Sequence, residues 1–64
     1  MQQHIGLTIR RLRERKKLSA RKLAQIAGVS QVSMIETGMR VGRLSTLGKI
    51  AKALGTTVGK LIDG

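Results

Sequence analysis

The segment from Leu18 to Gly38, LSARKLAQIAGVSQVSMIETG, places the strongest constraint on how this chain can fold. Leu23 and Ala27 recur at helical spacing before Gly28, and apolar residues resume at helical spacing after it. Glycine readily adopts the left-handed backbone conformation that ends a helix sharply, so Gly28 divides the apolar pattern in two. The segment therefore predicts two short amphipathic helices joined by a tight Gly-Val-Ser turn.

Apolar residues also recur at helical spacing on both sides of this segment, and they predict three further helices. The first is expected over about residues 3–16, and the fourth ends at Gly55 before a short fifth helix. No stretch alternates between apolar and polar residues as a half-buried strand does. The sequence therefore predicts an all-α fold, a compact bundle of about five short helices that forms a single domain over residues 1–64.

Hydroxyl residues precede four of the predicted helices, where a side-chain oxygen can accept a hydrogen bond from a free backbone amide. We expect these residues to be N-caps: Ser19, Ser30, Ser45 and Thr57. The apolar positions of the five helices and of the Gly-Val-Ser turn are expected to form the core: Ile5, Ile9, Leu12, Leu23, Ala24, Ile26, Ala27, Val29, Val32, Ile35, Leu47, Ile50, Ala51, Leu54, Val58, Leu61 and Ile62.

The charge balance indicates the class of partner. Thirteen Lys and Arg residues stand against three Asp and Glu residues, which gives a formal net charge of +10 and points to a polyanion. Because the chain has no Phe, Tyr or Trp, no base can stack on an aromatic side chain, which argues against single-strand and RNA-recognition modules. Double-stranded DNA fits better, since a short helix held by a second one can enter its major groove.

Other classes of function lack the residues they need. Without cysteine there is neither a disulfide nor a thiolate zinc site, so we expect a reducing, cytoplasmic compartment. No run approaches the ~20 apolar residues of a membrane span, and the apolar positions are too dispersed for a helix lying on an anionic membrane. Glu14, Glu36 and Asp63 lie far apart in the sequence. We therefore expect no enzyme activity, metal site, cofactor or small-molecule substrate.

The order LSARKLAQIAGVS, then IETG, then LSTLGKIAKALGTTVGKLI resembles the lambda-repressor and Cro-like helix-turn-helix family, also called the XRE family, over about residues 5–62. The resemblance implies a bundle whose second and third helices form the DNA-binding unit. It further implies a sequence-specific transcription regulator of the repressor type. Such a protein docks its third helix in the major groove and usually acts as a homodimer on a two-fold symmetric site.

The family's contacts are carried over only to matching positions. The resemblance places base reading at four residues: Ser30, Gln31, Ser33 and Met34. It places phosphate contacts at five: Ser19, Arg21, Thr37, Arg40 and Arg43. A Gln can form two hydrogen bonds with adenine, whereas a Met offers only apolar contact, for instance with a thymine methyl group. By the same resemblance, Glu36 should pair with Arg13 and tie the third helix to the first.

The third helix departs from the family pattern. Gly28 and Gly38 lie ten positions apart, two fewer than is typical of the family. At 3.6 residues per turn, a loss of two residues rotates the part of the helix before the gap by ~200° relative to the part after it. Alignment from the C-terminal end keeps Val32 and Ile35 on the core, so the loss falls on the end that usually reads bases. Ala20 also stands where the family often has a Gln.

Two alternatives therefore stay open. One is an engineered or degenerate helix-turn-helix variant, acting as a structural or self-associating module with at most non-specific DNA binding. The absence of Phe, Tyr, Trp, Pro, Cys and Asn from the chain also motivates this alternative. The other is that two residues of the natural chain are missing from this sequence, which an intact mass would show. The path of residues 28–38 in space decides whether a reading helix exists.

Overall fold

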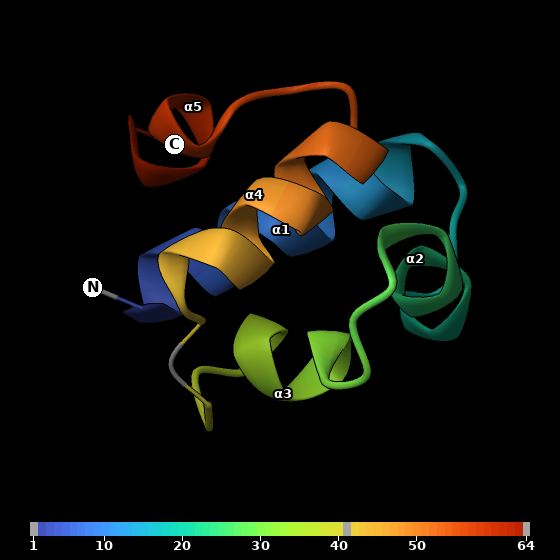
Figure 1. Cartoon of the computed structure of the whole chain (residues 1–64), viewed down its shortest axis with the longest axis horizontal. Coiled ribbons are helices and arrows are strands. Elements are labelled where there is room, and N and C mark those ends of the chain that lie inside the picture. Colours follow the sequence, from blue (N-terminus) through green and yellow to red (C-terminus); the bar gives the residue numbers. More distant parts are fainter. Residues whose placement is uncertain (1, 41, 64) are drawn as a thin grey trace.

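The computed structural model describes residues 2–40 and 42–63, with side chains from His4 onward, and the described residues form five α-helices and no strand. The helices are α1 (Gln2–Arg15), α2 (Ala20–Ala27), α3 (Val32–Glu36), α4 (Leu44–Ala53) and α5 (Val58–Asp63). α1 packs against α2, α3 and α5, while α2 packs against α3 and α4, and α4 against α5 (Figure 1). The predicted all-α bundle of five short helices is confirmed.

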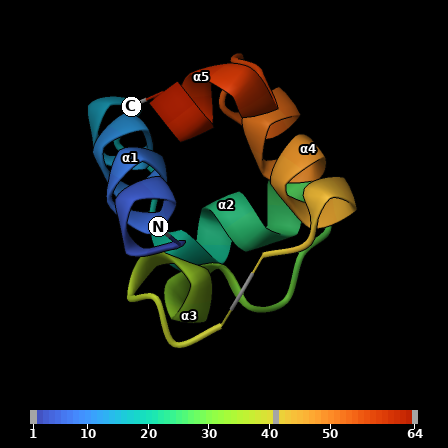
Figure 2. The same cartoon turned by 90° about the vertical axis from the view of Figure 1, so that its left-hand side faces the viewer.

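The core draws on all five helices. Figure 2 shows α1, α5, α4 and α2 arranged around it, with α3 at the lower edge. Ile9, Leu23, Ile50 and Leu61 come from four different helices and are fully buried, and α3 adds Val32. A domain of about 60 residues buries only roughly 60% of the surface that its unfolded chain exposes, so each of these contacts matters.

Two residues expected in the core lie outside it. Ile26 and Ile62 are each 52% exposed. Ile26 directly precedes Ala27, and Ile62 directly follows Leu61, and one residue turns a helix by about 100°. Because Ala27 and Leu61 lie on the packed faces of α2 and α5, their neighbours Ile26 and Ile62 point away from the core.

Two of the four predicted N-caps are confirmed. The Ser19 hydroxyl oxygen accepts a hydrogen bond from the Lys22 amide at 2.9 Å, and the Thr57 hydroxyl oxygen accepts one from the Lys60 amide at 3.3 Å. The prediction for Ser45 is wrong, because α4 begins one residue earlier, at Leu44.

Packing accounts for that earlier start of α4. Gly42 is buried against Leu47, so closely that a Cβ on Gly42 would lie 2.9 Å from a Leu47 methyl group. The Arg43 carbonyl oxygen accepts a hydrogen bond from the Leu47 amide at 2.8 Å. These contacts place Arg43 at the cap position, where its own side chain makes no capping bond.

α1 passes very close to the C-terminal end of α3 at Gly6. A Cβ placed on Gly6 would lie 2.5 Å from the carbonyl oxygens of both Ile35 and Glu36. Real Cβ atoms essentially never approach a backbone oxygen so closely, and these oxygens cannot move without moving α3. Gly6 therefore sets the distance between the two helices.

Replacing Gly6 by Ala should lower the free energy of unfolding by about 2 kcal/mol, because the added methyl group overpacks the contact with α3. For a domain of this size that corresponds to a fall of about 10 °C in Tm. The matched control is Gly48→Ala in α4, where a Cβ meets only a Val58 methyl group at 3.9 Å. That change should raise stability by about 0.5–1 kcal/mol. Thermal unfolding followed by circular dichroism measures both, and equal shifts would contradict the packing argument.

Candidate nucleic-acid interface

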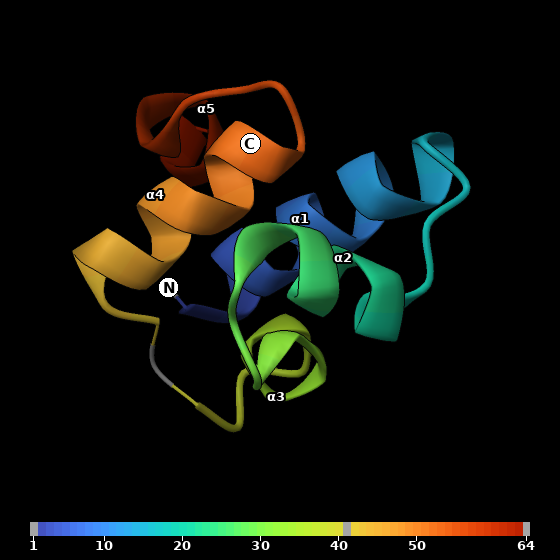
Figure 3. The same cartoon turned by 45° about the vertical axis from the view of Figure 1, so that its right-hand side comes forward.

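The turn between α2 and α3 has the predicted geometry. Gly28 adopts the left-handed conformation, with φ 69°, and its amide donates to the Ala24 carbonyl. The Val29 amide donates to the same carbonyl at 3.0 Å, and the half-buried Val29 side chain packs against the core. These two hydrogen bonds end α2 sharply, and the chain then turns towards α3 (Figure 3).

α3 is little more than one turn long. Three of its five residues, Val32, Ile35 and Glu36, are buried, which leaves Ser33 and Met34 to point outward. The Met34 side chain is 44% exposed. The described path of residues 28–38 therefore contains a short helix whose outward face consists of Ser33 and Met34.

The prediction that Ser30 caps this helix is wrong. α3 starts at Val32, and Gln31 holds the cap position with a non-helical backbone, φ −129° and ψ 38°, and no side-chain capping bond. Because Val32 must reach the core, residues 29–31 are used to span the distance from the end of α2. The short spacing between Gly28 and Gly38 thus shortens the helix rather than the turn.

The residues predicted to contact phosphate lie on three segments. Ser19 and Arg21 belong to the start of α2, Thr37 and Arg40 follow α3, and Arg43 precedes α4; all five are exposed. The first turn of α2, α3 and the link to α4 lie at the same end of the molecule (Figure 3). The structure therefore brings the segments that carry the predicted phosphate contacts to the end of the molecule where α3 lies.

Two of the hydroxyl groups on this face already serve the fold. The Thr37 hydroxyl donates to the Met34 carbonyl at 3.1 Å and helps to close α3. The Ser19 oxygen caps α2 as an acceptor, which leaves the hydroxyl proton available for an anionic oxygen. Of the two, Ser19 is better suited to donate to a phosphate.

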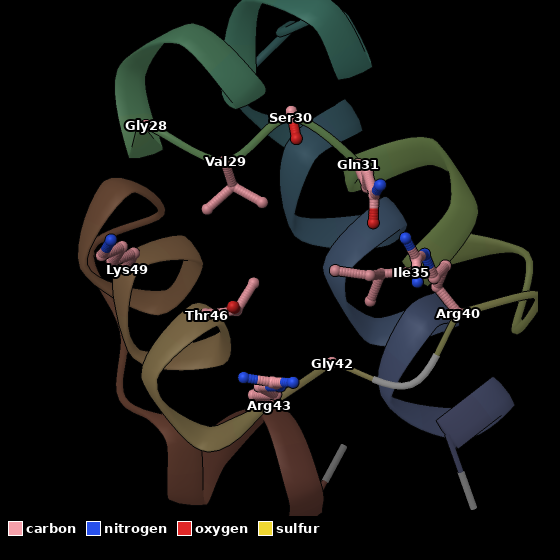
Figure 4. Close-up of a pocket in the computed structure, with 10 residues that line it drawn as sticks. All are labelled: Gly28, Val29, Ser30, Gln31, Ile35, Arg40, Gly42, Arg43, Thr46 and Lys49. Atoms are coloured by element: carbon pink, nitrogen blue, oxygen red, sulfur yellow. The ribbon is translucent and has the colours of Figure 1, made fainter.

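A cationic hollow of about 390 Å³ lies between the link that precedes α3, α3 itself and the first turns of α4 (Figure 4). Arg40, Arg43 and Lys49 line it, and none of its lining residues is Asp or Glu. Ser30, Gln31 and Thr46 add uncharged hydrogen-bonding groups. Such a concave cationic surface attracts anionic oxygens more strongly than the same charges dispersed on a flat one.

A second hollow lies on the other side of Ser30, where α2 faces α3. It is lined by Ala20, Arg21, Ala24, Ser30, Val32 and Ser33. Small side chains on α2 leave this space open, and Arg21 supplies its positive charge. Ser30 lines both hollows, so this exposed residue stands between them.

Thr46 and Lys49 were not predicted from the sequence. Arg43, Thr46 and Lys49 follow one another at intervals of three residues, a spacing that places side chains near one another on a helix. That spacing could have identified Thr46 and Lys49 as neighbours of Arg43.

The close contact at Gly6 could also have been predicted, since an isolated glycine inside a helical pattern commonly has a packing reason.

A charged pair on the core side holds this interface to the rest of the molecule. Arg13 donates through Nε and Nη2 to the two carboxylate oxygens of Glu36, at 2.7 and 2.9 Å, and the two side chains are only 13% and 6% exposed. The same guanidinium donates through Nη1 to the Leu18 carbonyl at 2.8 Å. The hydrogen bond with Glu36 raises the pKa of Arg13, against the opposing effect of burial. The predicted contact between Arg13 and Glu36 is present.

The fold and this face are those of a helix-turn-helix domain. A family model described as helix-turn-helix matches residues 9–61, most of the chain. The protein belongs to the lambda-repressor and Cro-like helix-turn-helix family, a family of DNA-binding regulatory domains. No curated protein and no solved structure matches the chain.

The described residues lack two other kinds of feature. No helix among them has the length and apolar character needed to cross a membrane. Nor do they contain three or more His, Asp or Glu residues grouped as a metal site would require.

A double-mutant cycle should show strong coupling between Arg13 and Glu36. Arg13→Ala and Glu36→Ala should each lower the free energy of unfolding by about 3 kcal/mol, because each leaves a buried charge without its partner. The double variant should lose clearly less than the sum of the two losses. The matched control is the exposed pair of Arg10 and Glu14, 3.4 Å apart, whose coupling should stay below about 0.5 kcal/mol. Urea unfolding measures both cycles, and similar coupling in the two would contradict the structural role.

Proposed function

We propose that this protein is a sequence-specific transcription regulator, of the repressor type, that docks α3 in the major groove of duplex DNA. The observation that carries the proposal is the cationic face around α2 and α3, on a helix-turn-helix chain with a net charge of +10. Phosphate attraction of this kind supplies most of the affinity of such proteins, and groove contacts supply the selectivity.

Base reading is shared between α3 and the link before it. Ser33 and Met34 stand on α3, while Ser30 and Gln31 approach the groove from the link. Gln31 can make two hydrogen bonds with adenine, and Met34 can contact a thymine methyl group. Because so few side chains reach the base edges, we expect a modest preference for the target over other sequences.

Phosphate contacts flank the reading residues on both sides. On one side, Ser19 and the free amides at the start of α2 face a phosphate, with Arg21 beside them. On the other side, Arg40 and Arg43 line the hollow and contact the DNA backbone, and Lys49 adds a third positive charge to the same hollow. Thr37, which is exposed directly after α3, is the fifth proposed phosphate contact.

The proposal includes a homodimer on a two-fold symmetric site. A dimer would place two copies of α3 in successive major grooves, about 34 Å apart. Met39, on the link after α3, and Leu44, the first residue of α4, are 78% and 71% exposed, and they offer apolar surface that a second copy can cover. We expect the dimer to act in the cytoplasm and to repress by occupying its site.

The short α3 favours a second candidate function, a self-associating module with at most non-specific DNA binding. The two functions differ in one measurable respect. A regulator prefers one duplex over a scrambled duplex of equal length at the same salt concentration, whereas the module binds both alike. Selection from a random duplex library and then this comparison separates them.

Replacing Arg40 or Arg43 by Gln should each lower the salt dependence of duplex binding, because a contact to one phosphate is lost. The slope of log K against log salt should fall by about 0.9 for each residue. Fluorescence anisotropy at salt concentrations of about 50 to 200 mM measures the slope. Lys60→Gln in α5 is the matched control, because Lys60 is exposed and lies outside the proposed interface. If Arg40→Gln and Arg43→Gln both kept the wild-type slope, as the Lys60→Gln control should, the assignment of these arginines to phosphates would be wrong.

Replacing Gln31 by Ala should reduce the preference for the selected duplex by about tenfold, since a bidentate contact to a base contributes roughly 1–3 kcal/mol of discrimination. Binding to the scrambled duplex should hardly change. Gln25→Ala is the matched control, because Gln25 is an exposed glutamine of α2 that lines neither hollow. A preference that Gln31→Ala leaves intact would remove Gln31 from the reading surface.

A further inference from the structure

Arg21, the second residue of α2, serves no contact within the fold. Its side chain is exposed, and its guanidinium makes no hydrogen bond or ion pair with another described residue. Both glutamates of the chain are already engaged, Glu14 with Arg10 and Glu36 with Arg13. The charge and the five N–H donors of Arg21 are therefore available for a ligand.

Arg21 lines the second hollow, where α2 faces α3, together with Ser30 and Ser33. This hollow has a volume of about 380 Å³, and none of its lining residues is Asp or Glu. Ala20 and Ala24 form its wall on α2, and neither side chain is long enough to fill it. The hollow therefore gives a long arginine side chain the space to approach the outward face of α3.

The short α3 explains why this space is open. α3 begins only at Val32, and Gln31 before it has a non-helical backbone. A further helical turn at this place would carry side chains into the space beside α2, whereas the link that replaces it places only the small Ser30 there. The same shortening that leaves few outward residues on α3 thus leaves room next to them.

The position of Arg21 differs from that of the groups at the very start of α2. Ser19 and the free amides of the first helical turn can hold a phosphate without the guanidinium. Arg21 instead borders the same hollow as Ser33, which points outward from α3 and is a proposed base-reading residue. A base pair that Ser33 approaches therefore lies within reach of the longer Arg21 side chain.

We infer that Arg21 extends along the second hollow into the major groove and reads a guanine there. This inference rests on the DNA-binding function proposed above, and it moves Arg21 from the phosphate contacts to the reading residues. A guanidinium can donate two parallel hydrogen bonds to N7 and O6 of guanine. No other base presents two acceptors side by side in the major groove, so the contact is selective.

Ser30 and Ser33 act as positioning residues for the guanidinium. When two of its five N–H groups bind guanine, three remain, and the serine hydroxyl oxygens that line the hollow can accept from them. Such support fixes the plane of the guanidinium against the base edge. The target of the protein should therefore contain a G·C pair next to the pairs read by Gln31 and Met34.

Arg21→Lys tests the inference, because lysine keeps the charge but lacks the forked pair of donors. A duplex selected by the wild type should contain the G·C pair, and replacing this pair by A·T should weaken wild-type binding at least about fivefold. In R21K the same replacement should change binding by less than about twofold, while binding to the scrambled duplex stays within about twofold of wild type.

R11K is the matched control. Arg11 is an exposed arginine of α1 that lines neither hollow, so R11K should keep the full guanine preference. Because Arg21 is exposed and unpaired among the described residues, R21K should change Tm by less than about 4 °C. A larger fall would show that the fold itself uses Arg21 and would overturn the inference.

A modified base provides an independent test. 7-Deazaguanine retains Watson–Crick pairing but lacks the N7 acceptor that the guanidinium needs. Placed at the selected guanine, it should weaken wild-type binding about threefold or more and hardly affect R21K. The same modification outside the target site is the control. Equal weakening of both proteins would mean that Arg21 does not read this guanine.

The remaining outcomes separate the inference from the function on which it rests. A wild-type protein that prefers no duplex over a scrambled one would overturn both. A preferred target without the G·C pair, or a guanine preference that R21K keeps, would overturn the inference alone. In that case Arg21 returns to the phosphate contacts, where lysine can replace it, and the regulator proposed above stands.

Discussion

The packing of α1 against the C-terminal end of α3, through Gly6 and the Arg13–Glu36 pair, is the interaction on which the rest of the structure depends. A helix of five residues has no appreciable stability in isolation, since it is little longer than the single turn that nucleates a helix. α3 is held instead by the close backbone contact at Gly6 and by the Arg13 guanidinium on Glu36. Arg13 also binds the Leu18 carbonyl, so one side chain joins α1, the start of the α2 segment and α3. The orientation of the outward residues of α3 therefore depends on contacts made on its opposite side.

In the proposed function, the short α3 leaves fewer contacts to bases and gives more of the binding to phosphate contacts. In place of a long helix, the chain presents one helical turn flanked by two hollows, with Ser30 between them. Fewer groups can reach base edges, whereas cations remain plentiful around the link to α4. The proposed function therefore depends more on general phosphate attraction than on base selectivity, which agrees with a net charge that is extreme for so small a chain.

The sequence predicted the helices better than their first residues. Ser19 and Thr57 cap α2 and α5 as expected, because the amides that they bind lie in the first turn, where the helix itself offers no acceptor. Ser30 and Ser45 do not, because the burial of Val32 and the packing of Gly42 on Leu47 decide where α3 and α4 begin. Exposed Ile26 and Ile62 show the same limit, since an apolar residue next to a short stripe can be counted with it although it points elsewhere.

The features that the sequence alone determined are local: the helical class, the sharp end of α2 at Gly28, most of the core and the excess of positive charge. Each of these depends on residue spacing, backbone preference or composition, and none requires knowledge of a distant contact. Only the tertiary structure decided the start of α3, the assembly of Arg43 and Lys49 into one hollow, and the need for glycine at position 6. The physical reason is that short helices are stabilised chiefly by packing, so their limits and neighbours are set by residues far away in the chain.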